Sequence, residues 1–197
     1  KLIDQIVLAT SKDACNDLLA EYVRGLEYSV FRGSEDDVLD RYYQAAKYAE
    51  ADFVVRITGD CPLIDPAIVD EVIAKFKSNN VDYASNLSPP TYPDGLDTEV
   101  FTYQALEIAW TSAKTTRERE HVTPFIRESD KFSQTNIAHH IDCSTERWTV
   151  DEPEDFILVE KIYESLYSNP LFLTQDVLRL LEKNPDIINI NNNISRN

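Results

Sequence analysis

The feature that most constrains the fold is a regular alternation of short apolar runs and helix-like segments in the N-terminal 84 residues. The apolar runs at 6–9, 28–31, 53–57 and 81–84 have the length and composition of buried strands. The segments between them carry apolar residues at helical spacing. Strands that alternate with helices form parallel sheets, because each helix returns the chain to the edge where the previous strand began. We therefore expect an α/β three-layer sandwich, with a mostly parallel sheet and helices on both faces.

Two of the helices have recognisable starts. Ser34, with Asp37 three residues later, resembles a capping box, and Asp65 followed by Pro66 has the pattern of an N-cap and a first helical residue. Both starts come soon after a predicted strand. The loops at 32–37 and 58–65 are therefore expected at the carboxyl edge of the sheet, where folds of this class bind ligands.

Beyond residue 86 the pattern is less regular, and it begins with a proline-rich loop. The remaining predicted elements are strands at 96–101 and 147–150, one or two strands within 132–141, helices at 102–113, 115–128 (kinked at Pro124), after Pro153 and at 174–182, and a loosely held polar tail at 189–197. A length of 197 residues fits one domain. We predict a single domain over 1–197, with 86–143 as a distinct subregion.

Charge and composition exclude several classes of protein. The formal net charge is −16, so non-specific binding to nucleic acid or to an anionic membrane surface is disfavoured. A phosphate group would have to be bound locally, by backbone amides, a few cations or a divalent metal. The three cysteines show no disulfide or zinc spacing, and no apolar run reaches transmembrane length. We expect a cytoplasmic protein.

Glycine is scarce, and the four glycines are too far apart for a dinucleotide-binding or P-loop motif. Phosphate chemistry must then come from other residues, and two carboxylates are candidates. Asp60 stands in Thr58-Gly59-Asp60-Cys61-Pro62-Leu63 at the end of a predicted strand, and Asp151 follows the predicted strand at 147–150. Mg²⁺ takes one or two carboxylates together with water and substrate phosphates. The alternative is that Asp60 caps a turn and that Asp151 only favours a helix N-terminus.

A set of ordered blocks gives the chain a family resemblance. These blocks are residues 31–42, 56–64, 93–101, 119–124 and 147–155. Together they resemble the cytidylyltransferase family of spore-coat polysaccharide biosynthesis, which is similar to the CMP-sugar synthetases for KDO and acylneuraminate. The resemblance implies a Rossmann-like nucleotidyltransferase (GT-A-like) fold. It also implies an enzyme that joins CTP and an acidic sugar into a CMP-sugar, with release of pyrophosphate.

The resemblance further implies roles for individual residues. Asp60 and Asp151 would be the catalytic pair that holds Mg²⁺. The nucleotide would be bordered by Arg32, Gly33, Ser34 and Gly59. The sugar, and a homodimer interface in the same subregion, would involve Asp97, Glu99, Glu120 and His121. For His121 the alternative is an ordinary surface histidine in a charged helix.

The family also implies a basic, glycine-containing phosphate loop after its first strand. No such loop is found in this sequence, and we expect it to be missing from the N-terminus of this chain. Two alternatives to the cytidylyltransferase hypothesis follow. One is a non-catalytic homologue that binds a nucleotide sugar, and the other is a related nucleotidyl- or glycosyltransferase that uses another nucleotide.

Overall fold

The structure is a computed structural model that describes residues 2–169 and 171–194. The chain forms two compact units. Unit 1 comprises residues 1–55, 76–84 and 100–135, and unit 2 comprises 56–75, 85–99 and 136–197. Both units are built from alternating stretches of chain, and the 86–143 segment contributes to both.

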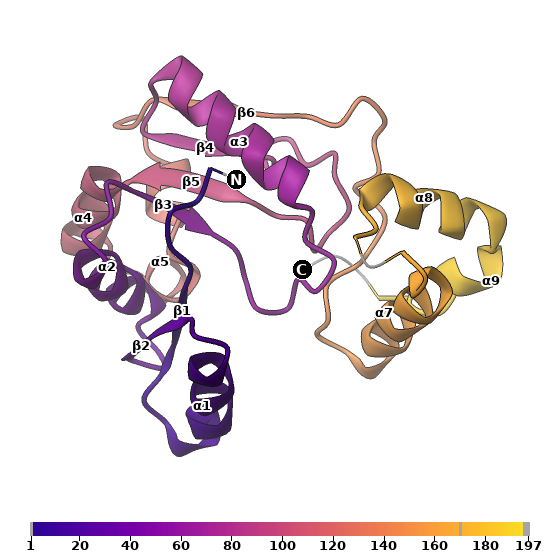
Figure 1. Ribbon diagram of the computed structural model, residues 1–197. Coiled ribbons are helices and arrows are strands. Elements are labelled where there is room, and N and C mark those ends of the chain that lie inside the picture. Colours follow the sequence, from indigo (N-terminus) through magenta and orange to yellow (C-terminus); the bar gives the residue numbers. More distant parts are fainter. Residues whose placement is uncertain (1, 170, 195–197) are drawn as a thin grey trace. The chain divides into compact units, whose positions relative to one another are not determined.

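The first strand–helix–strand repeat of unit 1 matches the sequence pattern. Strand β1 (Val7–Ser11) and strand β2 (Ser29–Gly33) pair in parallel, with Val7 opposite Ser29 and Ser11 opposite Gly33. A short 3₁₀ turn (Ala14–Asn16) and helix α1 (Asp17–Gly25) connect them, as Figure 1 shows. The alternation of apolar runs and a helix-like segment thus correctly predicts a βαβ unit here.

Helix α2 (Val38–Tyr48) follows β2, and its cap differs from the expected one. Asp37, not Ser34, is the N-cap, and its carboxylate accepts a hydrogen bond from the backbone N–H of Asp40 at 2.9 Å. The Ser34 hydroxyl accepts from the backbone N–H of Asp37 at 3.0 Å and so supports the residue before the helix. Arg119 also binds the Asp37 carboxylate, which ties the later helix α5 (Thr116–His121) to the start of α2.

The larger sheet has the strand order β3-β5-β4-β6. Its strands are β3 (Phe53–Arg56), β4 (Tyr83–Ser85), β5 (Glu99–Thr102) and β6 (Gln134–Asn136). Strand β5 comes after the proline-rich loop in sequence but lies between β3 and β4. Of the strands within 132–141, β6 is the one that forms.

Helices after β5 complete unit 1. The Thr102 hydroxyl caps α4 (Tyr103–Ser112), as the sequence predicts, by accepting from the N–H of Ala105 at 3.0 Å. The predicted kinked helix at 115–128 is instead two helices, α5 and α6 (Pro124–Arg127), because Val122 between them has a left-handed φ of 70°. Helix α2 packs against α4 and α5 (Figure 1). The buried core here comprises Leu39, Tyr43, Ala46, Tyr83, Phe101, Ala105, Leu106, Ala109, Val122, Ile126 and Phe132.

Unit 2 contains most of α3 (Pro66–Asn79) and the C-terminal helices α7 (Pro153–Leu166), α8 (Thr174–Lys183) and α9 (Pro185–Ile188). The three C-terminal helices pack on one another (Figure 1). Asp65 joins the starts of α3 and α8. One of its carboxylate oxygens accepts from the N–H of Ala67 at 2.8 Å, and the other accepts from the N–H and hydroxyl of Thr174 at 3.0 and 2.8 Å. The predicted N-cap at Asp65 is therefore confirmed.

The predicted strand at 147–150 does not form. Residue Arg147 makes an isolated parallel bridge with Asp94, and the N–H of Trp148 donates to the Asp94 carbonyl at 2.7 Å. Gly95 lies directly against this segment with φ of +100°. A Cβ at Gly95 would come within 2.6 Å of the Thr149 nitrogen, so both the conformation and the packing require glycine.

Within the described ranges, none of the helices is both long and apolar enough to cross a lipid bilayer.

We predict that Gly95→Ala destabilises the protein by about 2–5 kcal/mol, which combines left-handed strain with a backbone clash. The measurement is the free energy of unfolding from urea titration. Gly25→Ala is the matched control, because a Cβ at Gly25 would meet no atom within 4 Å. Equal stability of the Gly95→Ala and Gly25→Ala proteins would contradict the packing described for Gly95.

Candidate active site

The loop that carries Asp60 is held by short-range contacts. The Thr58 hydroxyl and the Cys61 thiol lie 3.2 Å apart, and the thiol donates to the Asp60 carboxylate at 3.6 Å. Burial raises the pKa of the Cys61 thiol to about 12, with further upward contributions from the nearby carboxylates of Asp60 and Asp97. Cys61 is therefore a protonated donor at neutral pH and is unsuited to act as a thiolate nucleophile.

Asp60 and Asp151 are brought together by the backbone. The Asp60 carbonyl accepts a hydrogen bond from the N–H of Val150 at 2.9 Å and another from the Thr149 hydroxyl at 3.2 Å. Val150 is the residue before Asp151, so the two aspartates predicted to act together lie on adjoining segments of unit 2. That their carboxylates share a metal ion stays a prediction.

The Asp151 carboxylate stands at the entrance to α7. Its side chain is 37% exposed, and it accepts a hydrogen bond from Arg147 Nη2 at 2.9 Å. Glu152 is the N-cap of α7, Pro153 the first helical residue, and Asp155 completes a capping box with Glu152. A plain capping role therefore belongs to Glu152 and Asp155, and the Asp151 side chain is left with a different set of contacts.

Arg147 and Asp155 form a buried ion pair beneath Asp151. The Arg147 side chain is 4% exposed and that of Asp155 0% exposed, and their closest nitrogen–oxygen distance is 2.9 Å. Burial by itself raises the pKa of Asp155. The hydrogen bonds from Arg147, Asn191 and the backbone N–H groups of Asp151 and Glu152 outweigh burial, and the pKa falls to about 2.

The donor set at Asp60 and Asp151 fits Mg²⁺. It provides hard carboxylate oxygens on adjoining segments, one of them on a partly exposed side chain. Within residues 2–169 and 171–194, no group of three or more His, Cys, Asp and Glu side chains is arranged to hold a metal. Zinc or another tightly caged metal would need such a group, whereas Mg²⁺ completes its shell with water and phosphate oxygens.

The predicted nucleotide-binding residues of unit 1 make contacts within that unit. Arg32 donates from Nε to the Ser11 carbonyl at 2.8 Å and pairs with Asp17 at 2.5 Å, so it fixes the loop after β1. Gly33 packs on α2, where an added Cβ would come within 2.8 Å of Arg41 Cγ. The Ser34 carbonyl accepts from Arg41 at 2.5 Å. Gly59, in unit 2, has open space where a Cβ would be, and the nucleotide roles of all four residues stay predictions.

The four residues predicted to bind sugar have different surroundings. Glu99 is buried in unit 2 and pairs with Arg56 at 2.6 Å. Asp97 is half-buried in the same unit, and Glu120 and His121 are exposed at the end of α5 in unit 1. Their assignment to the sugar remains a prediction.

Asn191 is a residue that the sequence analysis missed. Its side chain is buried, and Nδ2 donates to the Arg147 carbonyl at 2.9 Å and to Asp155 Oδ1 at 2.8 Å. The expected loosely held tail is thus wrong at this position, whereas 195–197 lie outside the described residues. An asparagine among other asparagines gives no local signal that one of them is buried.

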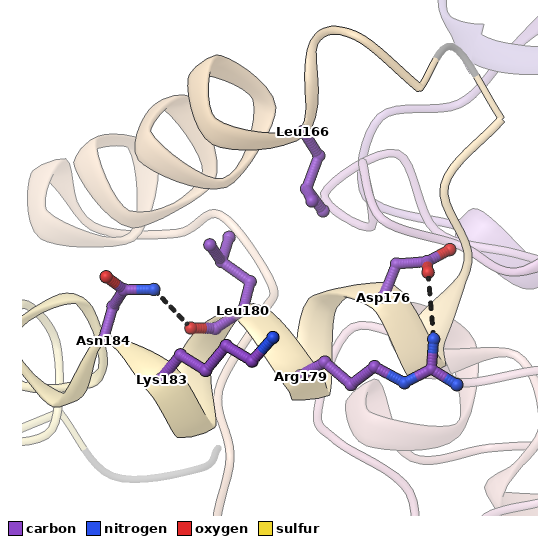
Figure 2. Close-up of a pocket in the computed structure, with 6 residues that line it drawn as sticks. All are labelled: Leu166, Asp176, Arg179, Leu180, Lys183 and Asn184. Atoms are coloured by element: carbon purple, nitrogen blue, oxygen red, sulfur yellow. Dashed lines mark hydrogen bonds and ion pairs between the residues drawn. The ribbon is translucent and has the colours of Figure 1, made fainter.

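A hollow of about 260 Å³ lies between the end of α7 and α8 (Figure 2). It is wide open and mostly apolar, and none of the predicted site residues lines it. Its walls are Leu166, Asp176, Arg179, Leu180, Lys183 and Asn184. The hollow has no convergent set of acidic or nucleophilic groups among these residues, and Asp60 and Asp151 stay the predicted catalytic pair.

Comparison with known proteins decides the family. A sequence profile described as cytidylyltransferase matches residues 1–183. The chain belongs to the cytidylyltransferase family. It is therefore a nucleotidyltransferase, and the resemblance seen in the ordered sequence blocks is confirmed.

Individual relatives agree with the family. The chain is 29% identical to the spore coat polysaccharide biosynthesis protein SpsF of Bacillus subtilis over 187 residues, which covers 93% of this chain and 77% of SpsF. The solved structure of a cytidylyltransferase from Leptospira borgpetersenii serovar Hardjo-bovis superposes with a TM-score of 0.88 at 34% identity. That match covers 92% of this chain and 77% of the other.

A more distant solved structure supports the same fold. CMP:2-keto-3-deoxy-manno-octonic acid synthetase complexed with CTP superposes with a TM-score of 0.58 at 12% identity, over 84% of this chain and 82% of that chain. At this identity the likeness concerns the fold alone. The Rossmann-like nucleotidyltransferase fold expected of this cytidylyltransferase is therefore confirmed.

The pKa of Asp155 makes a prediction about stability and pH. Its folded pKa of about 2 lies below the ordinary value of 3.8, so its contribution is fully present above about pH 4 and is lost as the pH falls toward 2. Asp155→Asn should cost roughly 3–5 kcal/mol at pH 7, because Arg147 is left buried without its main partner. The cost should shrink by roughly 2 kcal/mol between pH 5 and pH 2.

Urea titrations of both proteins between pH 2 and 7 measure this difference. Asp186→Asn, which removes an exposed carboxylate at the start of α9, is the control for loss of one charge. A cost of Asp155→Asn that does not change with pH would show that the Asp155 carboxylate gains nothing from its partners.

Proposed function

We propose that this cytidylyltransferase transfers the cytidylyl group of CTP to an acidic sugar of the nonulosonic or KDO type, in a reaction that requires Mg²⁺. The product, a CMP-sugar, would serve the synthesis of a surface or spore-coat polysaccharide. The observation that carries the proposal is the hydrogen bond from Val150 to the Asp60 carbonyl, which joins the segments of Asp60 and Asp151. The match to the cytidylyltransferase profile supports the choice of the cytidylyl group, and the likeness to SpsF supports a role in polysaccharide synthesis.

In the reaction, a sugar hydroxyl oxygen attacks the α-phosphorus of CTP, and the bond from that phosphorus to the bridging oxygen of the pyrophosphate breaks. The hydroxyl proton passes to water, and the pyrophosphate leaves with the electron pair of the broken bond. Chemistry of this kind depends on positioning and on neutralisation of charge more than on covalent catalysis. A chain with net charge −16 must meet the phosphate charge locally.

Asp60 and Asp151 are the residues that would hold the metal. When bound there, Mg²⁺ supplies positive charge that stabilises the phosphate oxygens of substrate and leaving group. Cys61 donates its S–H to Asp60, and Arg147 donates to Asp151, so each carboxylate has a protein donor that limits its orientation.

A cytoplasmic location belongs to the same proposal, and the free thiols of Cys15, Cys61 and Cys143 are compatible with a reducing compartment.

Nucleotide and sugar choice can be measured together. When ATP, GTP, UTP and CTP are compared, we expect pyrophosphate release to be fastest with CTP. We also expect the release to require a sugar acid such as KDO or a nonulosonic acid. Neutral sugars should give background rates. Equal rates with all four nucleotides would contradict the cytidylyl specificity and favour a nucleotidyltransferase for another nucleotide.

Asp60→Asn should lower Mg²⁺-dependent turnover by a factor of about 100 or more, because an amide oxygen is a far weaker ligand for a hard cation than a carboxylate. Thermal melting should show that the fold is retained. Asp142→Asn, which changes an exposed aspartate of the same unit, is the control and should keep wild-type turnover. Wild-type turnover in Asp60→Asn would remove Asp60 from the proposed metal site.

A further inference from the structure

We infer that Arg147, Asp155 and Asn191 form a positioning network that fixes the Asp151 carboxylate for metal binding. The inference rests on the proposed function in one respect, namely that Asp151 is a metal ligand. It assigns a role to Asn191, a residue from the chain segment that follows α9. None of the three positioning residues needs to contact substrate or metal for this role.

One nitrogen of Arg147 donates to two carboxylates. Nη2 donates to Asp151 Oδ2 at 2.9 Å and to Asp155 Oδ2 at 2.9 Å, while Nε donates to Asp155 Oδ1 at 3.0 Å. The guanidinium is planar, so the bonds to Asp155 determine where the shared nitrogen lies. The position of the Asp151 carboxylate therefore follows from the buried Asp155.

Asp155 also holds the backbone around Asp151. Its Oδ2 accepts from the N–H of Asp151 at 3.1 Å and from the N–H of Glu152 at 3.0 Å. The Asp155 carboxylate thus holds the main chain of Asp151 directly and its side chain through Arg147. A shift of Asp155 would move both.

Asn191 restrains the far side of this arrangement. From a buried position, its Nδ2 bonds to Asp155 Oδ1 at 2.8 Å and to the Arg147 carbonyl at 2.9 Å, so one amide group holds both members of the ion pair. It is uncharged, and its removal leaves the Arg147–Asp155 pair in place. Of the three positioning residues, Asn191 is therefore the one that can be replaced without removing a buried charge.

Outer-shell partners of metal-binding carboxylates and histidines typically affect metal affinity or activity by 10–100-fold. We expect Asn191→Ala to weaken binding of Mn²⁺, used as the probe for the divalent site, by about tenfold. Free Mn²⁺ is measured by electron paramagnetic resonance, with and without CTP. Asn192→Ala is the matched control, because Asn192 is an exposed neighbour that bonds only locally to Asn189 in the contacts described, and its Mn²⁺ affinity should equal that of the wild type.

Arg147→Lys provides a second variant. A lysine keeps the positive charge but has no fork with which to bridge Asp151 and Asp155, so Mn²⁺ affinity should fall in this variant as well. In both variants the Mg²⁺ concentration for half-maximal rate should rise, while KM for CTP at saturating Mg²⁺ stays near the wild-type value. A purely structural role would lower the melting temperature and leave Mn²⁺ affinity per folded molecule unchanged.

The outcomes separate this inference from the proposed function. Wild-type Mn²⁺ affinity in folded Asn191→Ala, or in Arg147→Lys if Asn191→Ala does not fold, overturns the network, even where the wild-type protein releases pyrophosphate from CTP. If the variants bind Mn²⁺ more weakly than the wild type, and the wild type shows no CTP-dependent turnover, the network is supported and the proposed reaction is overturned. A wild-type protein that binds no Mn²⁺ overturns the network, because Asp151 then holds no divalent ion.

Discussion

The organisation of unit 2 depends on a guanidinium that is buried almost completely. Arg147 can lie in the interior only because carboxylates surround it, with Asp155 and Asp151 each at 2.9 Å and Asp94 at 3.5 Å. These partners come from three places: the loop that contains Gly95, the segment just before the N-cap of α7, and the first turn of α7. The charge of one side chain thus determines which segments can meet, and the aspartate pair of the candidate site is part of the result.

Pairing of this kind also occupies other cations of this acidic protein. Several of its cationic side chains are already engaged with carboxylates, such as Arg32 with Asp17, Arg119 with Asp37 and Arg147 with Asp155. Their charges stabilise the protein's own loops and helix starts. The proposed mechanism therefore assigns part of the nucleotide's charge to a divalent ion held by Asp60 and Asp151.

Much of the fold could be predicted from local pattern, because local physics decides it. The βαβ start and the caps at Asp65 and Thr102 follow from apolar periodicity and capping chemistry. The segments of Asp60 and Asp151 adjoin for a different reason, because Thr149 and Val150 donate hydrogen bonds to the Asp60 carbonyl. The strand expected at 147–150 failed for a tertiary reason, since that segment bonds to Asp94 and Asp60 instead of entering a ladder. The burial of Asn191 was out of reach, because its partners Arg147 and Asp155 lie far away in the chain.

The position of β5 has a consequence for how the protein is made. Strands β3 and β4 leave the ribosome well before β5, yet each has β5 as its neighbour in the finished sheet. Until about residue 102 has been synthesised, β3 and β4 each have one strand edge without the partner that β5 later provides. A pause in synthesis within the proline-rich stretch before β5 would prolong the time for which those edges stay unpaired.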